Sequence, residues 1–271
     1  MSCPRLARFN RQWLAKTAMN SDQPAAVTGG PALGCEVLFE DDFCIVVNKP
    51  AGLLTQAPLG IDSLEMRVKR YLRDTGTTGE VYLGVPHRLD RPVSGAIVFA
   101  KSLKAAQRIS KQFESRRVEK TYWALVEGDV QPETGTWTDH LQKISGEPRA
   151  LVVAADVPEG RIAILHYRVL QRTSERSLLE ITLETGRNHQ IRVQSASRGH
   201  PLIGDELYGS RQPFGPWHDD ERQRLVALHA RRLRFWHHTA RQHITAEASL
   251  PAYWTDAGIS EPAPARPAFA D

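Results

Sequence analysis

The sequence predicts an α+β fold with one large mixed or antiparallel central sheet. Short strand-like segments follow one another with few helices between them, and no regular strand-helix-strand repeat runs through the 271 residues. A composition of 41% hydrophobic and 24% charged residues is ordinary for a globular protein with a real core. Small, polar and Gly/Pro-containing sequence near one end, and Pro/Ala-rich sequence at the other, predict flexible tails at residues 1–34 and 256–271 around a domain at residues 35–255.

The first expected elements are a strand and a helix. Residues 43–48 form an apolar run short enough for a buried strand, and it ends at Lys49-Pro50, where proline removes the next ladder donor. Asp62 is expected to begin a helix that ends near Gly76, with Glu65 completing a capping box. One face of this helix carries Leu64, Val68, Tyr71 and Leu72.

A second strand and helix follow at residues 96–113. Residues 96–100 are an apolar strand, and Ser102 is the expected N-cap of the helix after it. One side of that helix is predicted to bury Leu103, Ala106, Ile109 and Phe113, and the other carries Lys104, Arg108 and Lys111.

Further strands are expected along the rest of the domain. Leu179, Ile181 and Leu183 alternate with polar residues, which is the period of a half-buried strand. The predicted strands are residues 121–126, 162–170, 178–183, 227–235 and 243–248.

The charge pattern permits a polyanionic partner. Lys plus Arg number 35 against 31 Asp plus Glu, a net charge of +4 with a pI of about 9.0. Residues 222–241 hold six Arg and three His with no acid, and residues 101–120 hold seven Lys or Arg against two Glu. Solvated charged faces without such a partner have the same pattern, so this alternative stays open.

The cysteines and the N-terminus bear on the compartment. Three cysteines without a CxxC pair support neither a disulfide framework nor a zinc knuckle and fit a reducing compartment. No apolar run reaches the roughly 18 residues of a membrane span, and a secretory signal is absent. Four basic residues and no acid within residues 1–20 fit either an organellar transit peptide or a start upstream of Met19. We expect a cytoplasmic protein, with organellar import as the alternative.

Residues 87–95 (His-Arg-Leu-Asp-Arg-Pro-Val-Ser-Gly) are the most informative segment. Asp90 lies in a loop beside arginines, and the strand that follows anchors this loop from behind. Nearby positive charge favours the ionised carboxylate, which can then act as nucleophile or base. The plain structural alternative is that Asp90 caps a turn.

This segment resembles the signature of the RluA-type pseudouridine synthases, in which His-Arg-Leu-Asp precedes Thr/Ser-Gly and a strand ending in Ala-Lys. The chain departs from it at Val93, where the family most often has Thr, and at Gln194-Ser195, where it often has His-Leu. Residues 1–35 are also too short for the S4-like RNA-binding domain of many relatives. Other segments similar to the family follow in the right order at residues 48–52, 120–128, 183–192, 199–209 and 228–230.

The resemblance implies a pseudouridine synthase-like fold, with two subdomains, flanking helices and a catalytic cleft. The implied activity is isomerisation of specific uridines in rRNA or tRNA, without metal or cofactor, by a monomer. The base is detached at N1, turned, and reattached to C1′ through C5. Asp90 would be the nucleophile, or act in an elimination route, and Arg192 would grip and orient the carboxylate. Tyr122 would stack on the base, with help in removing the C5 proton as a second role.

The same resemblance and the local pattern indicate residues that bind RNA. Flipping the uridine out of the RNA helix costs a few kcal/mol of base stacking. Arg88 is the candidate that fills the gap which the flipped base leaves in the stack. Lys49 follows the first strand, and Arg187, His189 and Gln190 begin a predicted helix whose N-terminus favours phosphate. For His189, a helix cap is the structural alternative.

The sequence disfavours three alternatives to this function. A non-catalytic RNA-binding or ribosome-associated module would have no physical reason to retain the acid, aromatic and guanidinium together. A metal-free nuclease would need a paired His or Lys to protonate the leaving oxygen. A metal site is disfavoured, because no HExxH pattern is present and His229, His237 and His238 lie in an Arg-rich segment.

Overall fold

The computed structural model describes residues 27–28, 33–77 and 79–260. They form one sheet of 11 strands in the order β1-β2-β3-β4-β10-β5-β9-β8-β6-β7, with β11 paired to β10. The β4–β10 pair is parallel and the other named strand pairs are antiparallel, so the predicted mixed sheet is confirmed. The strands are β1 Val27–Thr28, β2 Glu36–Glu40, β3 Cys44–Lys49, β4 Ser94–Ala100, β5 Glu119–Glu127, β6 Thr134–Lys143, β7 Ala150–Val153, β8 Arg161–Arg172, β9 Arg176–Leu183, β10 Leu228–His237 and β11 Gln242–Glu247.

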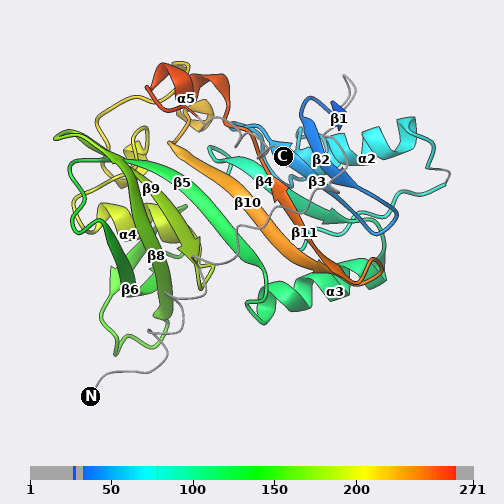
Figure 1. The fold of residues 1–271 in the computed structure, drawn as a ribbon, viewed down its shortest axis with the longest axis horizontal. Helices are drawn as coiled ribbons and strands as arrows, with labels where there is room; N and C mark the ends of the chain where they lie inside the picture. Colours follow the sequence, from blue (N-terminus) through cyan, green and yellow to red (C-terminus); the bar gives the residue numbers. More distant parts are fainter. Residues whose placement is uncertain (1–26, 29–32, 78, 261–271) are drawn as a thin grey trace, which may run out of the picture.

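Figure 1 shows the sheet as two halves joined through β10, with β5, β9, β8 and β6 on one side and β2, β3 and β4 on the other. Helix α3 packs against β4 and β10. Within the described part of the chain, no helix is long and apolar enough to cross a membrane. The helices are α2 Leu64–Asp74, α3 Leu103–Glu114, α4 Gln190–Ala196 and α5 Ala252–Asp256, with short 3-10 turns at Glu206–Tyr208 and Glu221–Gln223.

Helix α2 begins one residue later than predicted. Its N-cap is Ser63, whose hydroxyl accepts the Met66 N–H at 3.4 Å, whereas Asp62 pairs with Arg67. The expected capping box of Asp62 and Glu65 is therefore wrong. Its buried face carries Leu64, Val68 and Leu72, in agreement with the predicted periodicity.

Helix α3 has the predicted cap, since the Ser102 hydroxyl accepts the Ala105 N–H at 3.2 Å. Its buried face differs from the prediction, because Leu103 is 60% exposed while Gln112 is buried. The Gln112 amide donates to the Trp236 carbonyl at 3.0 Å and accepts the Trp236 N–H at 2.8 Å. These two bonds make an inward-facing glutamine favourable, and hydrophobic periodicity does not detect them.

All of the predicted strands are present, and β1, β2, β6 and β7 come in addition to them. Strands β6 and β7 pair with each other, and β6 also pairs with β8. Strand β6 carries a weak hydrophobic signal, because only Trp137 and Leu141 of its ten residues are buried.

The predicted boundaries of the domain are too narrow. Strand β1 pairs with β2, and the Leu33 side chain is completely buried in the core, so the domain begins before residue 35. At the other end Ile259 is 5% exposed, beyond the predicted limit at residue 255. The rest of the two predicted tails lies outside the described residues.

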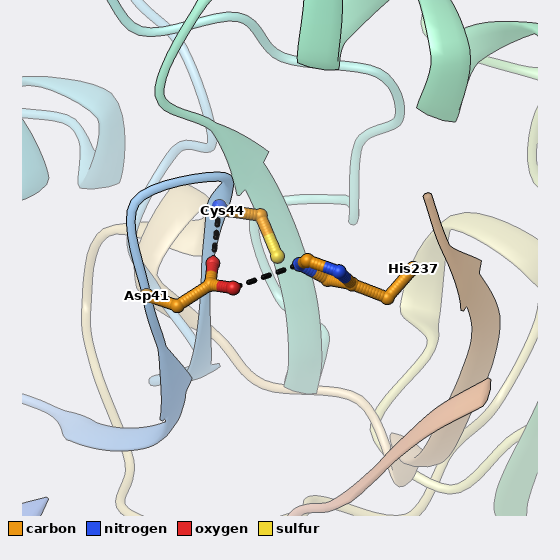
Figure 2. Close-up of side chains that lie close together, drawn as sticks. All are labelled: Asp41, Cys44 and His237. Carbon is orange, nitrogen blue, oxygen red and sulfur yellow. Dashed lines mark hydrogen bonds and ion pairs between the residues drawn. The ribbon is translucent and has the colours of Figure 1, made fainter. Parts of the chain in front are cut away.

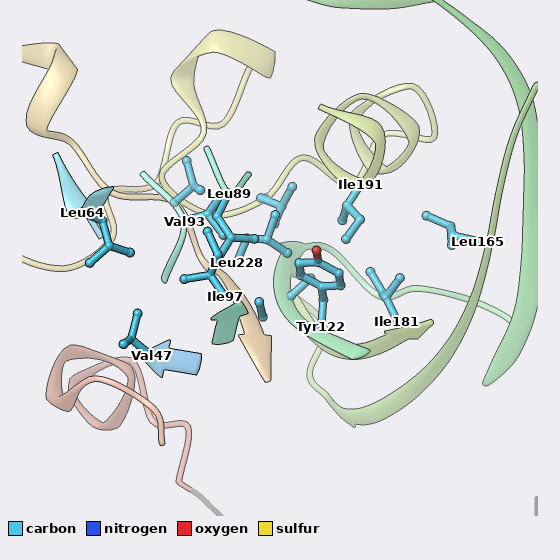
Figure 3. Packing of buried hydrophobic residues seen from close by; sticks show 14 of the residues in the cluster. Val47, Leu64, Leu89, Val93, Ile97, Tyr122, Leu165, Ile181, Ile191 and Leu228 are labelled. Atoms are coloured by element: carbon cyan, nitrogen blue, oxygen red, sulfur yellow. The ribbon is translucent and has the colours of Figure 1, made fainter. Parts of the chain in front are cut away.

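The largest core cluster spans both halves of the sheet (Figure 3). It includes Val47 and Ile97 from one half and Ile181 from the other, with Tyr122 of β5 among them. Because this core fixes β4 and β5 relative to each other, it also fixes the loop before β4 and the pocket-facing side of β5.

Candidate active site

A pocket of about 540 Å³ opens where the two halves of the sheet meet. Its walls come from the loop before β4, the end of α3, the start of β5, and the segment that joins β9 to α4. The charged and aromatic side chains that line it include Arg88, Asp90, Lys120, Tyr122, His189 and Arg192.

Asp90 lies in a turn directly before β4, in which the Val93 N–H donates to the Asp90 carbonyl at 3.1 Å. The preceding residue is anchored by Thr55, whose hydroxyl donates to the Leu89 carbonyl at 2.8 Å and accepts the Leu89 N–H at 3.2 Å. The Asp90 side chain stays 35% exposed. A fixed backbone with an accessible carboxylate is the arrangement that a nucleophile or base requires.

Lys49 binds the backbone of this turn through its ammonium. Its ammonium donates to the carbonyls of Pro50 at 2.9 Å, Arg91 at 3.3 Å and Val93 at 2.7 Å, and the residue has no exposed surface. Burial lowers the pKa of Lys49 to about 7, and the charge of Asp90 opposes this shift. The prediction that Lys49 binds RNA is wrong, because a fully buried ammonium with three carbonyl partners acts on the position of Asp90.

Arg192 lies in the first turn of α4, and its fork grips a different carboxylate from the one predicted. Nε and Nη2 donate to the two oxygens of Asp205, both at 2.7 Å, while Nη1 lies 3.6 Å from Asp90 Oδ2. Burial by itself lowers the pKa of Arg192, but the hydrogen bonds and the charge of Asp205 outweigh burial and raise that pKa. Asp205 thus orients the guanidinium, whose remaining nitrogen faces Asp90.

His189 joins this network through both ring nitrogens. Nε2 accepts from Arg192 Nη1 at 3.2 Å, since a guanidinium has no lone pair to offer, and Nδ1 then carries the proton toward the Tyr208 oxygen at 2.9 Å. Burial lowers the pKa of His189, so its contact with Asp90 at 3.6 Å is that of a neutral ring. His189 is the residue directly before α4 and has a φ of 52°. Its side chain makes no hydrogen bond that caps the helix, so the alternative that His189 is a helix cap through its side chain is wrong.

Tyr122 projects from β5 into the inner end of the pocket and is 9% exposed. Figure 3 shows its ring among Leu228, Ile181 and Ile191. Burial, and then the negative charge of Asp90, raise the pKa of Tyr122, so the phenol is neutral. An apolar ring held in one place beside a carboxylate offers a flat surface on which a base can stack.

The remaining predicted RNA contacts separate into two groups. Gln190 is buried, and its amide bonds Thr185, the Arg187 N–H and the Ile164 carbonyl, so its predicted contact with RNA is wrong. Arg88 is exposed at the rim of the pocket, and Arg187 lines it with Nε bound to the Ile162 carbonyl at 2.9 Å. Both stay predictions as RNA-binding residues.

His87 is a structural residue of the motif. Its Nε2 accepts the Val98 N–H at 3.2 Å, and its ring stacks on Phe113 with centroids 4.4 Å apart. Burial, and then the charge of Lys120, lower the pKa of His87 to about 3. It is therefore a neutral ring that ties the turn to β4 and α3.

One cluster of metal-ligating residue types lies outside the pocket (Figure 2). The ligand atoms of Asp41, Cys44 and His237 lie within 4.8 Å of one another. His237 Nδ1 accepts the Ala240 N–H at 2.9 Å, so the ring proton sits on Nε2, 2.9 Å from Asp41 Oδ2. A protonated nitrogen has no free lone pair for a metal, and burial raises the pKa of the Cys44 thiol. This cluster ties the β2–β3 turn to the end of β10.

Sequence reasoning missed Asp205 and Tyr208, which complete the site around Arg192. A signal was present, because both lie in the segment at residues 199–209 that resembles the family. That segment carried no residue assignment, since a carboxylate far from Asp90 in the sequence does not by itself indicate a partner.

Comparison with known proteins gives the family. The model of the family described as RNA pseudouridylate synthase matches residues 43–197. The chain belongs to this family. Its enzymes are isomerases, and the earlier resemblance to the RluA type is confirmed.

Two pseudouridine synthase relatives illustrate the similarity. An uncharacterized RNA pseudouridine synthase of Zymomonas mobilis subsp. mobilis is 36% identical over 84% of this chain and 100% of its own length. The ribosomal large subunit pseudouridine synthase D of Xanthomonas campestris pv. campestris is 35% identical over 79% of this chain and 66% of its own.

A solved structure agrees with the pseudouridine synthase fold. Human RNA pseudouridylate synthase domain containing 4 has a TM-score of 0.67 and covers 81% of this chain and 90% of its own. It is 24% identical in sequence, so this likeness bears on the fold alone.

Proposed function

We propose that this protein isomerises uridines in RNA to pseudouridine, with Asp90 as the reacting carboxylate. The observation that carries the proposal is the convergence of Asp90, Tyr122 and Arg192 in one pocket, from three separate elements of the fold. A carboxylate, a stacking ring and a guanidinium are the groups that this reaction needs, and isomerisation requires neither a redox change nor a group donor.

Asp90 acts on the sugar-base unit that enters the pocket. In the substitution route its carboxylate attacks C1′ as the N1–C1′ bond breaks, and in the elimination route it removes a sugar proton. In both routes the freed uracil turns and its C5 bonds to C1′. This step breaks the Asp90–C1′ bond in the substitution route, and in the elimination route the removed proton returns to the sugar. The C5 proton then leaves and N1 gains a proton. The proposal is common to the two routes, because each requires an ionised and accessible carboxylate.

Tyr122 and Arg192 position the groups that react. A neutral Tyr122 ring stacks on the uracil while it turns, and its burial disfavours a role as a base in the free protein. The Arg192 guanidinium lies 3.6 Å from Asp90 Oδ2 and orients this carboxylate through its positive charge. Because Asp205 holds that guanidinium in place, no reorganisation is needed when the substrate arrives.

The proposed substrate is ribosomal or transfer RNA. The name of the Xanthomonas relative places its action on the large ribosomal subunit, which favours large-subunit rRNA as the first RNA to test. Arg88 at the rim is proposed to fill the stack that the flipped uridine leaves. We further propose that the protein works as a monomer in the cytoplasm, the compartment that its unpaired cysteines fit.

The test is tritium release from RNA labelled at C5 of uridine, using unmodified transcripts of large-subunit rRNA and of tRNAs. Wild-type protein is expected to release tritium without an added cofactor, whereas Asp90→Asn keeps the fold and loses turnover, since an amide cannot supply the anion. A rate for Asp90→Asn within tenfold of wild type would remove Asp90 from this role. Wild-type protein that binds these RNAs without release would favour the non-catalytic module.

A further inference from the structure

Lys120 is a pocket residue that the reaction described so far does not use. It lies on β5 two residues before Tyr122, so both side chains leave the same face of the strand about 7 Å apart. Its ammonium lies directly over Gly186, where an added Cβ would come within 3.1 Å of Nζ. Within the part of the chain that the structure describes, no hydrogen bond or ion pair is recorded for this ammonium.

Two more cations stand at the same end of the pocket. Arg116, at the end of α3, acts on both Lys120 and Arg187 through its charge, and all three line the pocket. Two acids, Glu114 and Glu184, also line the pocket, and both are exposed. Glu184 Oε1 lies 3.8 Å from Arg116 Nη1, and an exposed ion pair of this kind offsets the repulsion among the three cations only weakly.

This grouping is unfavourable in the free protein. Burial, and then the charge of Arg116, lower the pKa of Lys120 to about 8. Burial, followed by Arg116 and Arg161, likewise lowers the pKa of Arg187. Cations that lose water and repel one another in a pocket gain most from an anion that binds between them.

We propose that Lys120, Arg116 and Arg187 form a cradle for the backbone phosphate next to the uridine that occupies the pocket. The inference rests on the proposed function, which places the uracil on Tyr122. Lys120, farther along β5, then faces the backbone phosphate next to this uridine. It acts as a positioning residue that fixes the register of the RNA strand in the pocket.

A phosphate fits these residues better than the other RNA groups do. A uracil carbonyl is neutral and accepts one or two hydrogen bonds, so it leaves the repulsion of three cations in place. A phosphate carries a full negative charge and several acceptor oxygens, which matches an ammonium beside two guanidinium groups. Gly186 leaves room for this anion and exposes the backbone between Lys120 and Arg187.

The test compares Lys120→Met with wild type on a C5-tritiated transcript of large-subunit rRNA. Apparent affinity is expected to fall about tenfold, with kcat within about threefold, because a positioning cation contributes to binding. The plot of log affinity against log salt should become shallower by about 0.7 to 0.9, the change for one lost phosphate contact. Lys120→Arg should restore most of the affinity.

Lys69→Met is the matched control, since it removes a lysine of α2 that pairs with Glu65 outside the pocket. It should leave both affinity and salt slope unchanged. If Lys120→Met does not fold, Lys120→Gln serves instead, because it removes the charge and keeps a polar side chain of similar length. This variant should lower affinity severalfold.

The outcomes test the phosphate cradle independently of the isomerase activity. An unchanged salt slope with a lower kcat would make Lys120 a base contact and overturn the phosphate cradle, as would equality with the Lys69 control. Wild-type protein without tritium release would contradict the isomerase, while the salt slopes measured on the same transcript would still decide on the cradle.

Discussion

The charged side chains at the two ends of the pocket differ in whether they have buried partners. At the inner end Arg192 has a buried carboxylate partner in Asp205, and the turn of Asp90 is held by two bonds from Lys49, to the carbonyls of Arg91 and Val93. At the outer end the charges of Arg116 and Lys120 repel each other, and the two acids that line this part of the pocket, Glu114 and Glu184, are exposed.

This difference fits the roles that we propose for the two ends. Groups that act on the reacting bonds need a fixed geometry, and buried partners that do not touch substrate supply it. Groups that bind a backbone phosphate need unbalanced charge, which a permanent carboxylate partner would cancel. The four changes below test this division, from the largest expected effect to the smallest.

Asp205→Asn should have the largest effect, because it leaves the buried Arg192 cation without its counterion. We expect unfolding to become easier by about 3 to 5 kcal/mol, and turnover to fall by about 10²-fold or more as the guanidinium shifts. Chemical denaturation and tritium release measure the two effects. Asp129→Asn, which breaks a surface pair with Arg172 at 3.6 Å, is the control and should cost less than about 1 kcal/mol. Equal losses in the two variants would refute the supporting role of Asp205.

Arg192→Lys tests geometry separately from charge. Lysine keeps the positive charge but lacks the fork that binds both Asp205 oxygens, so kcat should fall by about 10²-fold while RNA affinity changes little. Arg168→Lys is the control, since Arg168 of β8 pairs with Glu180 of β9 outside the pocket. It should change neither kcat nor RNA affinity. Parallel losses of affinity and kcat would instead assign Arg192 to phosphate binding and break the comparison between the two ends.

Lys49→Met removes two bonds to the Asp90 turn, at the carbonyls of Arg91 and Val93, and a third bond to the Pro50 carbonyl. We expect a loss of about 2 kcal/mol in the free energy of unfolding, since buried carbonyls lose their donor, and a fall in kcat at unchanged RNA affinity. Stopped assays of tritium release and an RNA-binding titration measure the two. A fall in affinity alone would return Lys49 to the RNA-binding role that the structure argues against.

The pH dependence of RNA binding should show the smallest effect. Lys120 binds phosphate as the ammonium, with Arg116, Arg187, Glu184 and the neutral His87 around it, and its pKa in the free protein is about 8. Below pH 8 the cation is present, so affinity should fall severalfold only as pH rises from about 7 to 8.5. Lys120→Met should lack this fall. A wild-type affinity that is flat across this range would show that Lys120 stays out of RNA binding.

Much of the fold could be predicted from the sequence, because the relevant signals are local. The apolar run at residues 43–48 became β3, and alternation at residues 178–183 identified β9. Where side-chain hydrogen bonds compete with hydrophobic pattern, as at Gln112 of α3 and in the weakly apolar β6, the prediction failed.

The sequence by itself determined the residues that we propose for the chemistry, since Asp90, Tyr122 and Arg192 each stand in a segment that resembles a motif of the family. Only the tertiary structure decided which group each one meets. Arg192 pairs with Asp205, 13 residues away, and Lys49 reaches Val93, 44 residues away. A sequence period gives the side of an element on which a side chain lies, whereas its partner depends on how distant elements pack, which no local pattern contains.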